Sequence, residues 1–148
     1  MSDPHFNFSE MICFSLYATS NAMIRNYRLP LKACDLTYPQ LMVMMALWNQ
    51  DKISIKEISQ QTFFDAGTLT QILARLEQKN LIKSIRSETD KRSKIVIITA
   101  KGIELEQKTS HIFPEMECKL ALTVNEQKTI IGVCQKILSR LAKSDDQK

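Results

Sequence analysis

Residues 65–77, which read Asp-Ala-Gly-Thr-Leu-Thr-Gln-Ile-Leu-Ala-Arg-Leu-Glu, show the clearest helical pattern in the chain. Apolar residues recur there at the spacing of one helix face, at Leu69, Ile72, Leu73 and Leu76. Polar residues line another face, at Thr68, Gln71, Arg75 and Gln78. Asp65 is a residue type that caps helix N-termini, so the pattern predicts a helix from Asp65 to about Lys79. Its apolar face should be buried, and its polar, hydrogen-bonding face should be exposed.

Upstream of this segment, Ser54 and Glu57 have the spacing of a capping box, which predicts a short helix ending near Gln61. Two helices separated by so short a connection form a helix-turn-helix. Downstream, residues 81–86 and 95–99 have the composition of β-strands, and the polar loop 87–94 joins them. The sequence therefore predicts a β-hairpin directly after the helix-turn-helix.

The predicted hairpin carries a local excess of positive charge. The cations between residues 83 and 94 are Lys83, Arg86, Lys91, Arg92 and Lys94, and the acids are Glu88 and Asp90. Taken alone, such a segment is most often a solvated loop. Beside a helix-turn-helix it indicates a winged helix, whose second helix can enter a major groove while the hairpin reaches the neighbouring minor groove.

A helical pattern also precedes this lobe. Ser9 is expected to cap a first helix, rich in apolar residues, that continues until Pro30 interrupts the pattern. Thr37 and Gln40 form a second capping box, with a proline in the first turn, and predict a helix to about Asn49.

After the hairpin, Thr99 is expected to cap a helix that Pro114 breaks or kinks. Thr123 and Glu126 then begin a last helix, whose apolar residues recur from Ile130 onwards. The predicted fold class is mostly α with a small β-hairpin. It is a winged helix-turn-helix with N- and C-terminal helices that form a dimerisation region.

Length and composition exclude several other classes of protein. A chain of 148 residues with 44% hydrophobic and 24% charged residues favours a single globular domain. No apolar run approaches the roughly 20 residues that span a bilayer, and no signal peptide is evident, so we expect a cytoplasmic protein with no membrane partner. The cysteines have no Cys-x-x-Cys spacing, so neither a metal site nor a cofactor is predicted. The formal net charge of +4 does not by itself indicate nucleic acid.

The run 65–77, followed by Leu81-Ile82 and by Asp90-Lys-Arg-Ser93, closely resembles the recognition helix and wing of MarR-type regulators. The resemblance covers nearly the whole chain. It implies one MarR-type domain, residues 1–148, with a DNA-binding lobe at about 37–99 and dimerisation helices at about 6–30 and 100–143. It also implies a homodimer that binds double-stranded DNA at a pseudo-palindromic operator.

The same resemblance implies roles for individual residues. The residues expected at major-groove edges or adjacent phosphates are Thr68, Thr70, Gln71 and Arg75. Arg92 is expected in the minor groove, with Asp90 orienting it. Ala74 stands where many relatives carry a lysine, and Gln71 where some carry a proline, so the preferred operator is expected to differ.

Within that family, the segment Cys13-Phe-Ser-Leu-Tyr17, then Tyr27, then residues 36–40, is similar to the oxidation-sensing subgroup of organic-hydroperoxide repressors. The similarity implies that Cys13 is the sensor and that Tyr17, Tyr27 and Tyr38 surround it. Independently of the family, a cysteine near a helix N-terminus is favoured as the thiolate, and Tyr17 is one turn away.

In two-cysteine members of the subgroup, a cysteine on the C-terminal side of the other subunit locks the oxidised sensor as a disulfide. Cys118 is the expected partner, because it follows Pro114 in what we expect to be a mobile connection, whereas Cys134 lies on the apolar stripe of the last helix and Cys34 has no matching role. Capping of Cys13 by a small thiol stays open as an alternative. A second hypothesis is a MarR-type regulator released by a small phenolic or aromatic ligand. A peroxide-reducing enzyme is disfavoured, because no activating charge and no Cys-x-x-Cys accompany Cys13.

Overall fold

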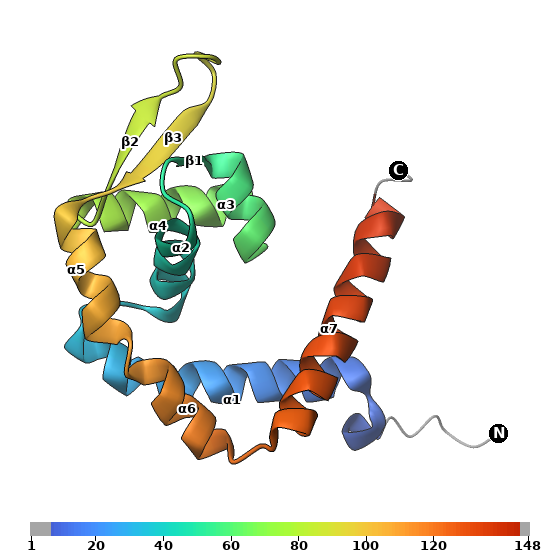
Figure 1. Ribbon diagram of the computed structural model, residues 1–148. Coiled ribbons are helices and arrows are strands. Elements are labelled where there is room, and N and C mark those ends of the chain that lie inside the picture. Colours follow the sequence, from blue (N-terminus) through green and yellow to red (C-terminus); the bar gives the residue numbers. More distant parts are fainter. Residues whose placement is uncertain (1–6, 146–148) are drawn as a thin grey trace. The chain divides into compact units, whose positions relative to one another are not determined.

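The computed structural model describes residues 7–145 and shows a mostly helical chain with one small sheet (Figure 1). The elements are η1 (Phe8–Glu10), α1 (Ile12–Ala33), α2 (Tyr38–Asn49), β1 (Ile53–Ser54), α3 (Ile55–Thr62), α4 (Ala66–Gln78), β2 (Ile82–Arg86), β3 (Lys94–Ile98), α5 (Ala100–Thr109), α6 (Ile112–Leu120) and α7 (Val124–Asp145). The chain divides into two compact units, Met1–Ile112 and Phe113–Lys148. The winged helix-turn-helix lies entirely in the first unit.

The predicted helix starts of this lobe are confirmed. The capping boxes of α2 and α3 both form, with the side chains of Thr37 and Ser54 accepting from the N3 backbone amides and the N3 side chains bonding back. Asp65 caps α4 by accepting from the amide of Thr68. These reciprocal bonds satisfy amides that have no partner inside the helix, which is why the sequence marks the starts so clearly.

The hairpin is confirmed, and a third strand that the sequence analysis missed joins it. Strand β2 pairs antiparallel with β3, with Ser84 opposite Val96. Strand β1 pairs with the other edge of β3, with Ile53 opposite the same Val96, so the strand order is β1-β3-β2. Strand β1 has two residues, too few to show an alternating pattern.

The core of the first unit forms around α2 and the apolar face of α4. The predicted stripe of α4 is buried at Leu69, Ile72, Leu73 and Leu76. Residues of α2 that are also buried are Leu41, Val43, Met44 and Leu47. At the rim of this core, Trp48 Nε1 donates to the carbonyl O of Gly102 at 2.9 Å, which ties α2 to α5.

Three expectations about the outer helices are wrong. Ser9 does not cap the first helix: Asn7 accepts from the Ser9 amide in a 3₁₀ turn, and α1 begins at Ile12. Pro30 does not end α1, which continues to Ala33 with Leu31 fully buried. The burial of Leu31 offsets the lost backbone bond. Pro114 does not break a helix either, because it lies in the first turn of α6, where its missing amide costs nothing.

The second unit contains the rest of α6 and all of α7. The predicted capping box at Thr123 and Glu126 forms, with the Glu126 carboxylate accepting from the Thr123 amide at 2.8 Å. The hydrogen bonds from Thr123 hold the pKa of Glu126 below its usual value. Helix α7 then runs from Val124 to Asp145.

Gly102 should be required for the close packing of α5 on the base of the wing. A Cβ there would overlap the Leu81 carbonyl O and lie 2.7 Å from Ile98 Cγ1. We expect Gly102→Ala to lower the free energy of unfolding by about 1–3 kcal/mol, measured by urea denaturation. Gly67→Ala is the matched control, because a Cβ at Gly67 meets only the side chain of Asp65, at 3.3 Å. Equal stability of the two variants would contradict this packing.

Candidate nucleic-acid interface and thiol site

The N-terminus of α4 is built around Asp65. Its carboxylate accepts from the Thr68 amide at 2.9 Å and from Thr68 Oγ1 at 2.7 Å. The backbone hydrogen bond from Thr68 is the main reason why the pKa of Asp65 lies below its usual value. Just before it, Phe63 adopts a left-handed conformation with φ 60 and makes the tight turn between α3 and α4.

The outward face of α4 carries the polar residues that the sequence predicted there. Thr68, Thr70, Gln71 and Arg75 are all exposed. The hydroxyl of Thr70 donates to the Ala66 carbonyl at 2.8 Å, as the hydroxyl of Thr68 donates to Asp65. Gln71 and Arg75 have no such intrahelical bond within residues 7–145, so their donors are available to another molecule.

A shallow depression of about 130 Å³ joins this face to the start of α2. It is lined by Thr37, Pro39, Gln40, Thr68, Gln71, Ile72 and Arg75. A helix N-terminus presents backbone amides and a partial positive charge, which suit a phosphate group. The sequence analysis missed this neighbourhood: the capping box at Thr37 marked the helix start, but only the tertiary fold places that start beside α4.

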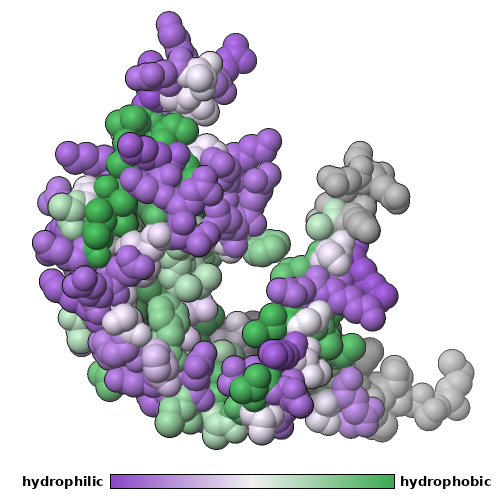
Figure 2. Space-filling model, in the orientation of Figure 1, coloured by the Kyte–Doolittle hydropathy of each residue, from purple (hydrophilic) through white to green (hydrophobic). Residues whose placement is uncertain are grey.

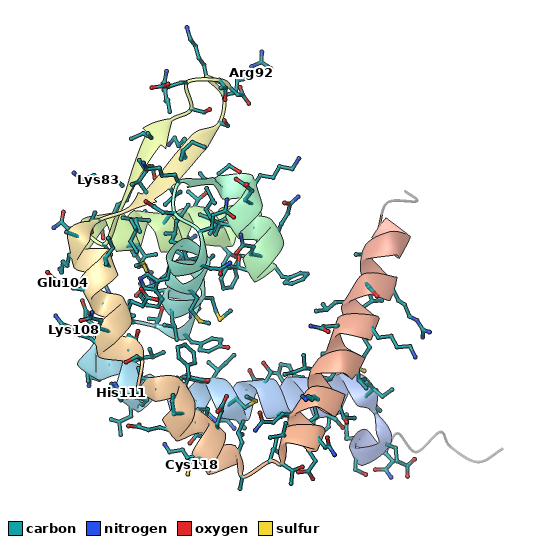
Figure 3. All side chains as sticks on the ribbon, in the orientation of Figure 1. Lys83, Arg92, Glu104, Lys108, His111 and Cys118 are labelled. Atoms are coloured by element: carbon teal, nitrogen blue, oxygen red, sulfur yellow. The ribbon has the colours of Figure 1, made fainter. Side chains whose placement is uncertain are left out.

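The wing tip is held by hydrogen bonds centred on Asp90. Its Oδ1 accepts from the Arg92 amide at 3.0 Å, and its carbonyl accepts from the Ser93 amide at 2.9 Å. Arg92 itself is exposed and projects from the tip (Figure 3). In the part of the chain that the structure describes, Asp90 orients the backbone at Arg92 and forms no ion pair with its guanidinium group.

Cys13 is the second residue of α1 and is exposed, as is Tyr17 one turn later, at 69% exposure. The thiol therefore lies at a helix N-terminus, as predicted, and is not part of the core of this chain.

The other two predicted tyrosines lie together, away from Cys13. The rings of Tyr27 and Tyr38 are 4.9 Å apart between centroids and tilted by 45°. Tyr27 is buried and Tyr38 is half-buried, and burial raises the pKa of Tyr38. Tyr27 follows Cys13 by 14 positions along α1, a rise of about 21 Å at about 1.5 Å per residue. Within one chain, Tyr27 and Tyr38 therefore lie together, and both are distant from Cys13.

The remaining cysteines are free thiols on different elements. Cys118 is exposed and lies within α6 (Figure 3), not in the mobile connection that its position after Pro114 had suggested. Cys34 follows α1, and Cys134 lies in α7. Within residues 7–145 no cluster of three or more His, Cys, Asp or Glu side chains could hold a metal ion. No helix among the described residues is both long and apolar enough to cross a membrane.

Each unit exposes apolar side chains at its surface. In the first unit they include a group near the N-terminus of α1, namely Phe8, Ile12, Phe14, Leu16 and Tyr17. In the second they are Val124, Ile130, Ile131, Val133, Leu138 and Leu141 of α7, where Figure 2 shows hydrophobic residues among hydrophilic ones. Large exposed apolar side chains gathered on one segment are typical of a protein interface.

Residues 26–109, from the last turns of α1 to the end of α5, match the family model described as transcriptional regulator SarA/Rot. The match covers more than half of the chain and includes every element of the winged helix-turn-helix. The chain belongs to this MarR-type family. The fold class predicted from the sequence is confirmed with it.

This SarA/Rot-type regulator is similar in sequence to two curated relatives and in structure to one solved protein, as follows. It is 37% identical over 108 residues to the organic hydroperoxide resistance transcriptional regulator of Bacillus subtilis, covering 73% of this chain and 74% of the relative. It is 33% identical over 131 residues to SarZ of Staphylococcus haemolyticus, covering 88% and 89%. The structure of AbfR of Staphylococcus epidermidis has a TM-score of 0.77 at 28% identity, covering 91% and 93%; AbfR is also known in its reduced form bound to DNA.

The Asp65 cap of α4 in this SarA/Rot-type regulator gives a pH-dependent prediction of stability. The folded pKa of Asp65 is lowered, so its contribution to stability is present above the unfolded pKa and is lost as the pH falls through the folded pKa. Asn also caps helices but does not titrate. We therefore expect Asp65→Asn to be less stable than the wild type at about pH 7 and the difference to shrink below about pH 4. Urea denaturation of both proteins across that range tests this, and a difference independent of pH would contradict it.

Proposed function

We propose that this SarA/Rot-family regulator is a homodimeric DNA-binding repressor that leaves its operator when an organic peroxide oxidises Cys13. The observation that carries the proposal is the position of Cys13, an exposed thiol at a helix N-terminus and beside apolar surface that a second copy would cover. The regulators it resembles are not enzymes, and we assign it no catalytic activity.

The DNA-binding half of the proposal rests on the exposed face of α4 and on the wing. Gln71 and Arg75 offer uncommitted donors for base edges, with Thr68 and Thr70 beside them. Arg92 at the wing tip offers a planar fork of donors that suits a narrow minor groove. The shallow depression at the start of α2 suits a backbone phosphate. A pseudo-palindromic site then requires two copies of this lobe.

Dimerisation is proposed for the outer helices, residues about 6–30 and 100–143, within a single MarR-type domain. Phe6 lies outside the described residues. The exposed apolar residues of α1 and α7 supply the surface, because two such faces leave water when two copies associate. One lobe alone presents a single recognition helix and gives few base contacts.

The thiol site is completed, in this proposal, by the second copy. A helical rise of about 21 Å is more than the side chains of Cys13 and Tyr27 can bridge within one chain. If Tyr27 and Tyr38 surround the sensor, as in the subgroup that the sequence resembles, they belong to the other subunit. Tyr17, at one helical turn, can act within the same chain.

A lock is needed after oxidation, because a sulfenic acid is only slightly larger than a thiol. We propose an intersubunit disulfide with Cys118, whose exposed thiol on α6 is accessible to another chain. In that step the Cys118 thiolate attacks the sulfur of the Cys13 sulfenic acid, the S–S bond forms, the S–O bond breaks and hydroxide leaves as water after protonation. Capping of Cys13 by a small thiol is the alternative.

A second candidate function is release by a small phenolic or aromatic ligand. It is favoured by a cavity of about 410 Å³ lined by Ile24, Arg28, Leu36, Thr37, Tyr38 and Pro39. Its volume and mixed lining are those of a small-molecule site. Release of operator by a phenolic acid, unchanged in Cys13→Ser, would favour this function over oxidation.

The roles of the DNA-facing residues predict different binding defects. Arg92→Ala should weaken binding to many sequences and reduce the dependence of affinity on salt, because it removes one cation from the wing. Gln71→Ala should relax the preference at one or two base pairs, each worth about 1–3 kcal/mol. Fluorescence anisotropy with operator and scrambled duplexes at several salt concentrations separates the two effects. Normal operator binding by Arg92→Ala at physiological salt would rule out this use of the wing.

The oxidation switch predicts a covalent dimer and loss of DNA binding. After treatment with an organic hydroperoxide, gel shift should show release of operator, and non-reducing electrophoresis should show a disulfide-linked dimer. Both should be lost in Cys13→Ser, and the covalent dimer should be lost in Cys118→Ser. Cys134→Ser is the control, and it should behave as the wild type.

Three other outcomes have distinct meanings. If the Cys13→Ser variant still releases operator after treatment with an organic hydroperoxide, Cys13 is not the sensor. A covalent dimer that survives Cys118→Ser would exclude Cys118 as the partner. Release without any covalent dimer, together with an added mass on Cys13, would assign the switch to capping by a small thiol.

A further inference from the structure

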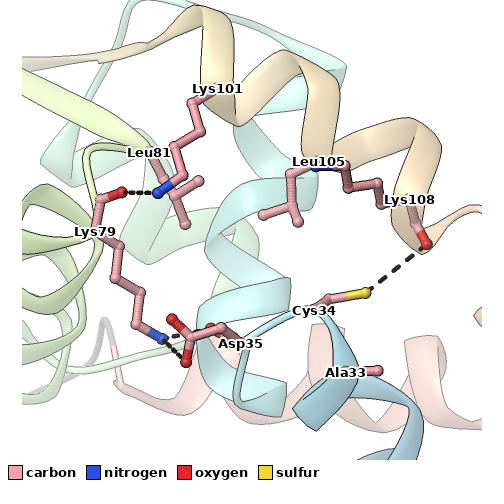
Figure 4. A pocket seen from close by; sticks show the side chains of 8 residues that line it. All are labelled: Ala33, Cys34, Asp35, Lys79, Leu81, Lys101, Leu105 and Lys108. Atoms are coloured by element: carbon pink, nitrogen blue, oxygen red, sulfur yellow. Dashed lines mark hydrogen bonds and ion pairs between the residues drawn. The ribbon is translucent and has the colours of Figure 1, made fainter.

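The ends of α1 and α4 meet α5 around one cavity of about 400 Å³ in the first unit (Figure 4). The lining residues are Ala33, Cys34, Asp35, Lys79, Leu81, Lys101, Leu105 and Lys108. They come from the end of α1, from the end of α4 and the residues just after it, and from α5 between its first and last turns. Because helix C-terminal ends carry partial negative charge, lysines are favoured around such a junction.

Two of the three lysines are committed to those helix ends. Lys101 Nζ donates to the Lys79 carbonyl O at 2.8 Å, and Lys79 Nζ donates to the Asp35 carbonyl O. Cys34 donates its thiol to the Lys108 carbonyl O at 3.8 Å (Figure 4). The ammonium groups of Lys79 and Lys101 thus donate to backbone carbonyls at the ends of α1 and α4. These bonds join the three helices.

Lys79 makes the largest set of these bonds. Besides the Asp35 carbonyl, its Nζ lies 3.3 Å from Asp35 Oδ1 and 3.1 Å from Gln40 Oε1. Gln40 is only 3% exposed, and its Oε1 also accepts from the Thr37 amide at 3.2 Å. Lys79 is itself the C-cap of α4. One ammonium group therefore links the end of α1, the first turn of α2 and the end of the recognition helix.

Burial of the apolar stripe does not by itself fix the exact rotation of α4 about its axis or its position along that axis. Apolar burial has no direction, so small rotations or shifts of α4 along its axis change little buried area. Hydrogen bonds depend on angle and distance and oppose such shifts. Arg75 is one turn before Lys79 and Gln71 two turns before it, so fixing the C-cap fixes where both side chains point.

We propose that Lys79 is a positioning residue for operator recognition, which holds α4 at the rotation and height that bring Gln71 and Arg75 to the base edges. The proposal rests on the proposed DNA-binding function and adds a residue that does not itself touch DNA. The ion pair with Asp35, whose side chain is 87% exposed, contributes less than the bonds to Gln40 and to the Asp35 carbonyl.

Lys79→Met is the direct test, because it keeps the aliphatic stem and removes the donors. Gln40 Oε1 retains its bond from the Thr37 amide, so no buried acceptor is left without a partner and the fold should persist. Lys108→Met is the matched control. It removes the same charge from the same cavity, and within residues 7–145 the Lys108 ammonium has no hydrogen-bond or ion-pair partner.

The measurement is the ratio of affinities of reduced protein for two duplexes, one selected from a random pool by the wild type and one scrambled, over a range of salt concentrations. We expect Lys79→Met to reduce this ratio at least about fivefold, as for loss of one base contact, with an unchanged salt slope. Lys108→Met should keep the wild-type ratio, and Lys79→Arg should restore part of it.

The other outcomes overturn the proposal in distinguishable ways. An unchanged ratio in Lys79→Met with a lower melting temperature would mean that Lys79 only stabilises the fold. Equal weakening on both duplexes with a salt slope smaller by about 0.9 would mean that Lys79 contacts a phosphate directly. A wild type that does not prefer the selected duplex would overturn the DNA-binding function and this proposal with it.

Discussion

Burial of one apolar stripe on α4 determines where the rest of the candidate DNA interface lies. Leu69 and Leu76 are completely buried, and burial of each such side chain contributes about 1.5–3 kcal/mol. With that stripe facing the core, the helix must turn Gln71 and Arg75 outward. The wing depends on the same core, because Leu81 and Ile82 are buried at the base of β2 only a few residues after α4 ends. The polar bonds of Asp65 and Lys79 then fix the two ends of a helix that the stripe has already oriented.

The exposed apolar surface of α1 and α7 matters for the proposed function as much as the buried stripe of α4 does. Helices α1 and α7 each expose apolar residues in their own unit, and Cys13 lies among those of α1. A second copy that covers this surface would supply the second recognition helix. It would also supply Tyr27 and Tyr38 to Cys13, because α1 is too long for the two tyrosines of the same chain to reach that thiol. DNA binding and oxidation sensing would then depend on the same association. Because α1 ends at the bonds of Lys79, a displacement of this helix would reach the end of α4 directly.

Local signals in the sequence predicted most of the fold. Five capping residues, Thr37, Ser54, Asp65, Thr99 and Thr123, each marked a helix start correctly because the bonds involved are local. Pro30 and Pro114 predicted wrong helix boundaries, since tertiary burial and a first-turn position allow a proline inside a helix. The bonds of Lys79 to Asp35 and Gln40 could not be predicted, because they join residues 44 and 39 positions apart in sequence. Cys13 and Tyr27 both lie before Pro30, within one predicted helix, so their separation was implicit in the sequence pattern. The contact between the rings of Tyr27 and Tyr38 needed the tertiary fold.

The most direct test of the account is whether the tyrosines act on the thiol of the other subunit. A heterodimer of one Cys13→Ser chain and one Tyr38→Phe chain retains a single Cys13, on the chain that lacks the Tyr38 hydroxyl. If the second copy completes the site, that Cys13 faces an intact Tyr38, and an organic hydroperoxide should oxidise it at the wild-type rate per thiol. The Tyr38→Phe homodimer should react more slowly, because the hydroxyl donor is missing at both sites. A heterodimer as slow as that homodimer would place Tyr38 and Cys13 in the same chain's site and contradict the account.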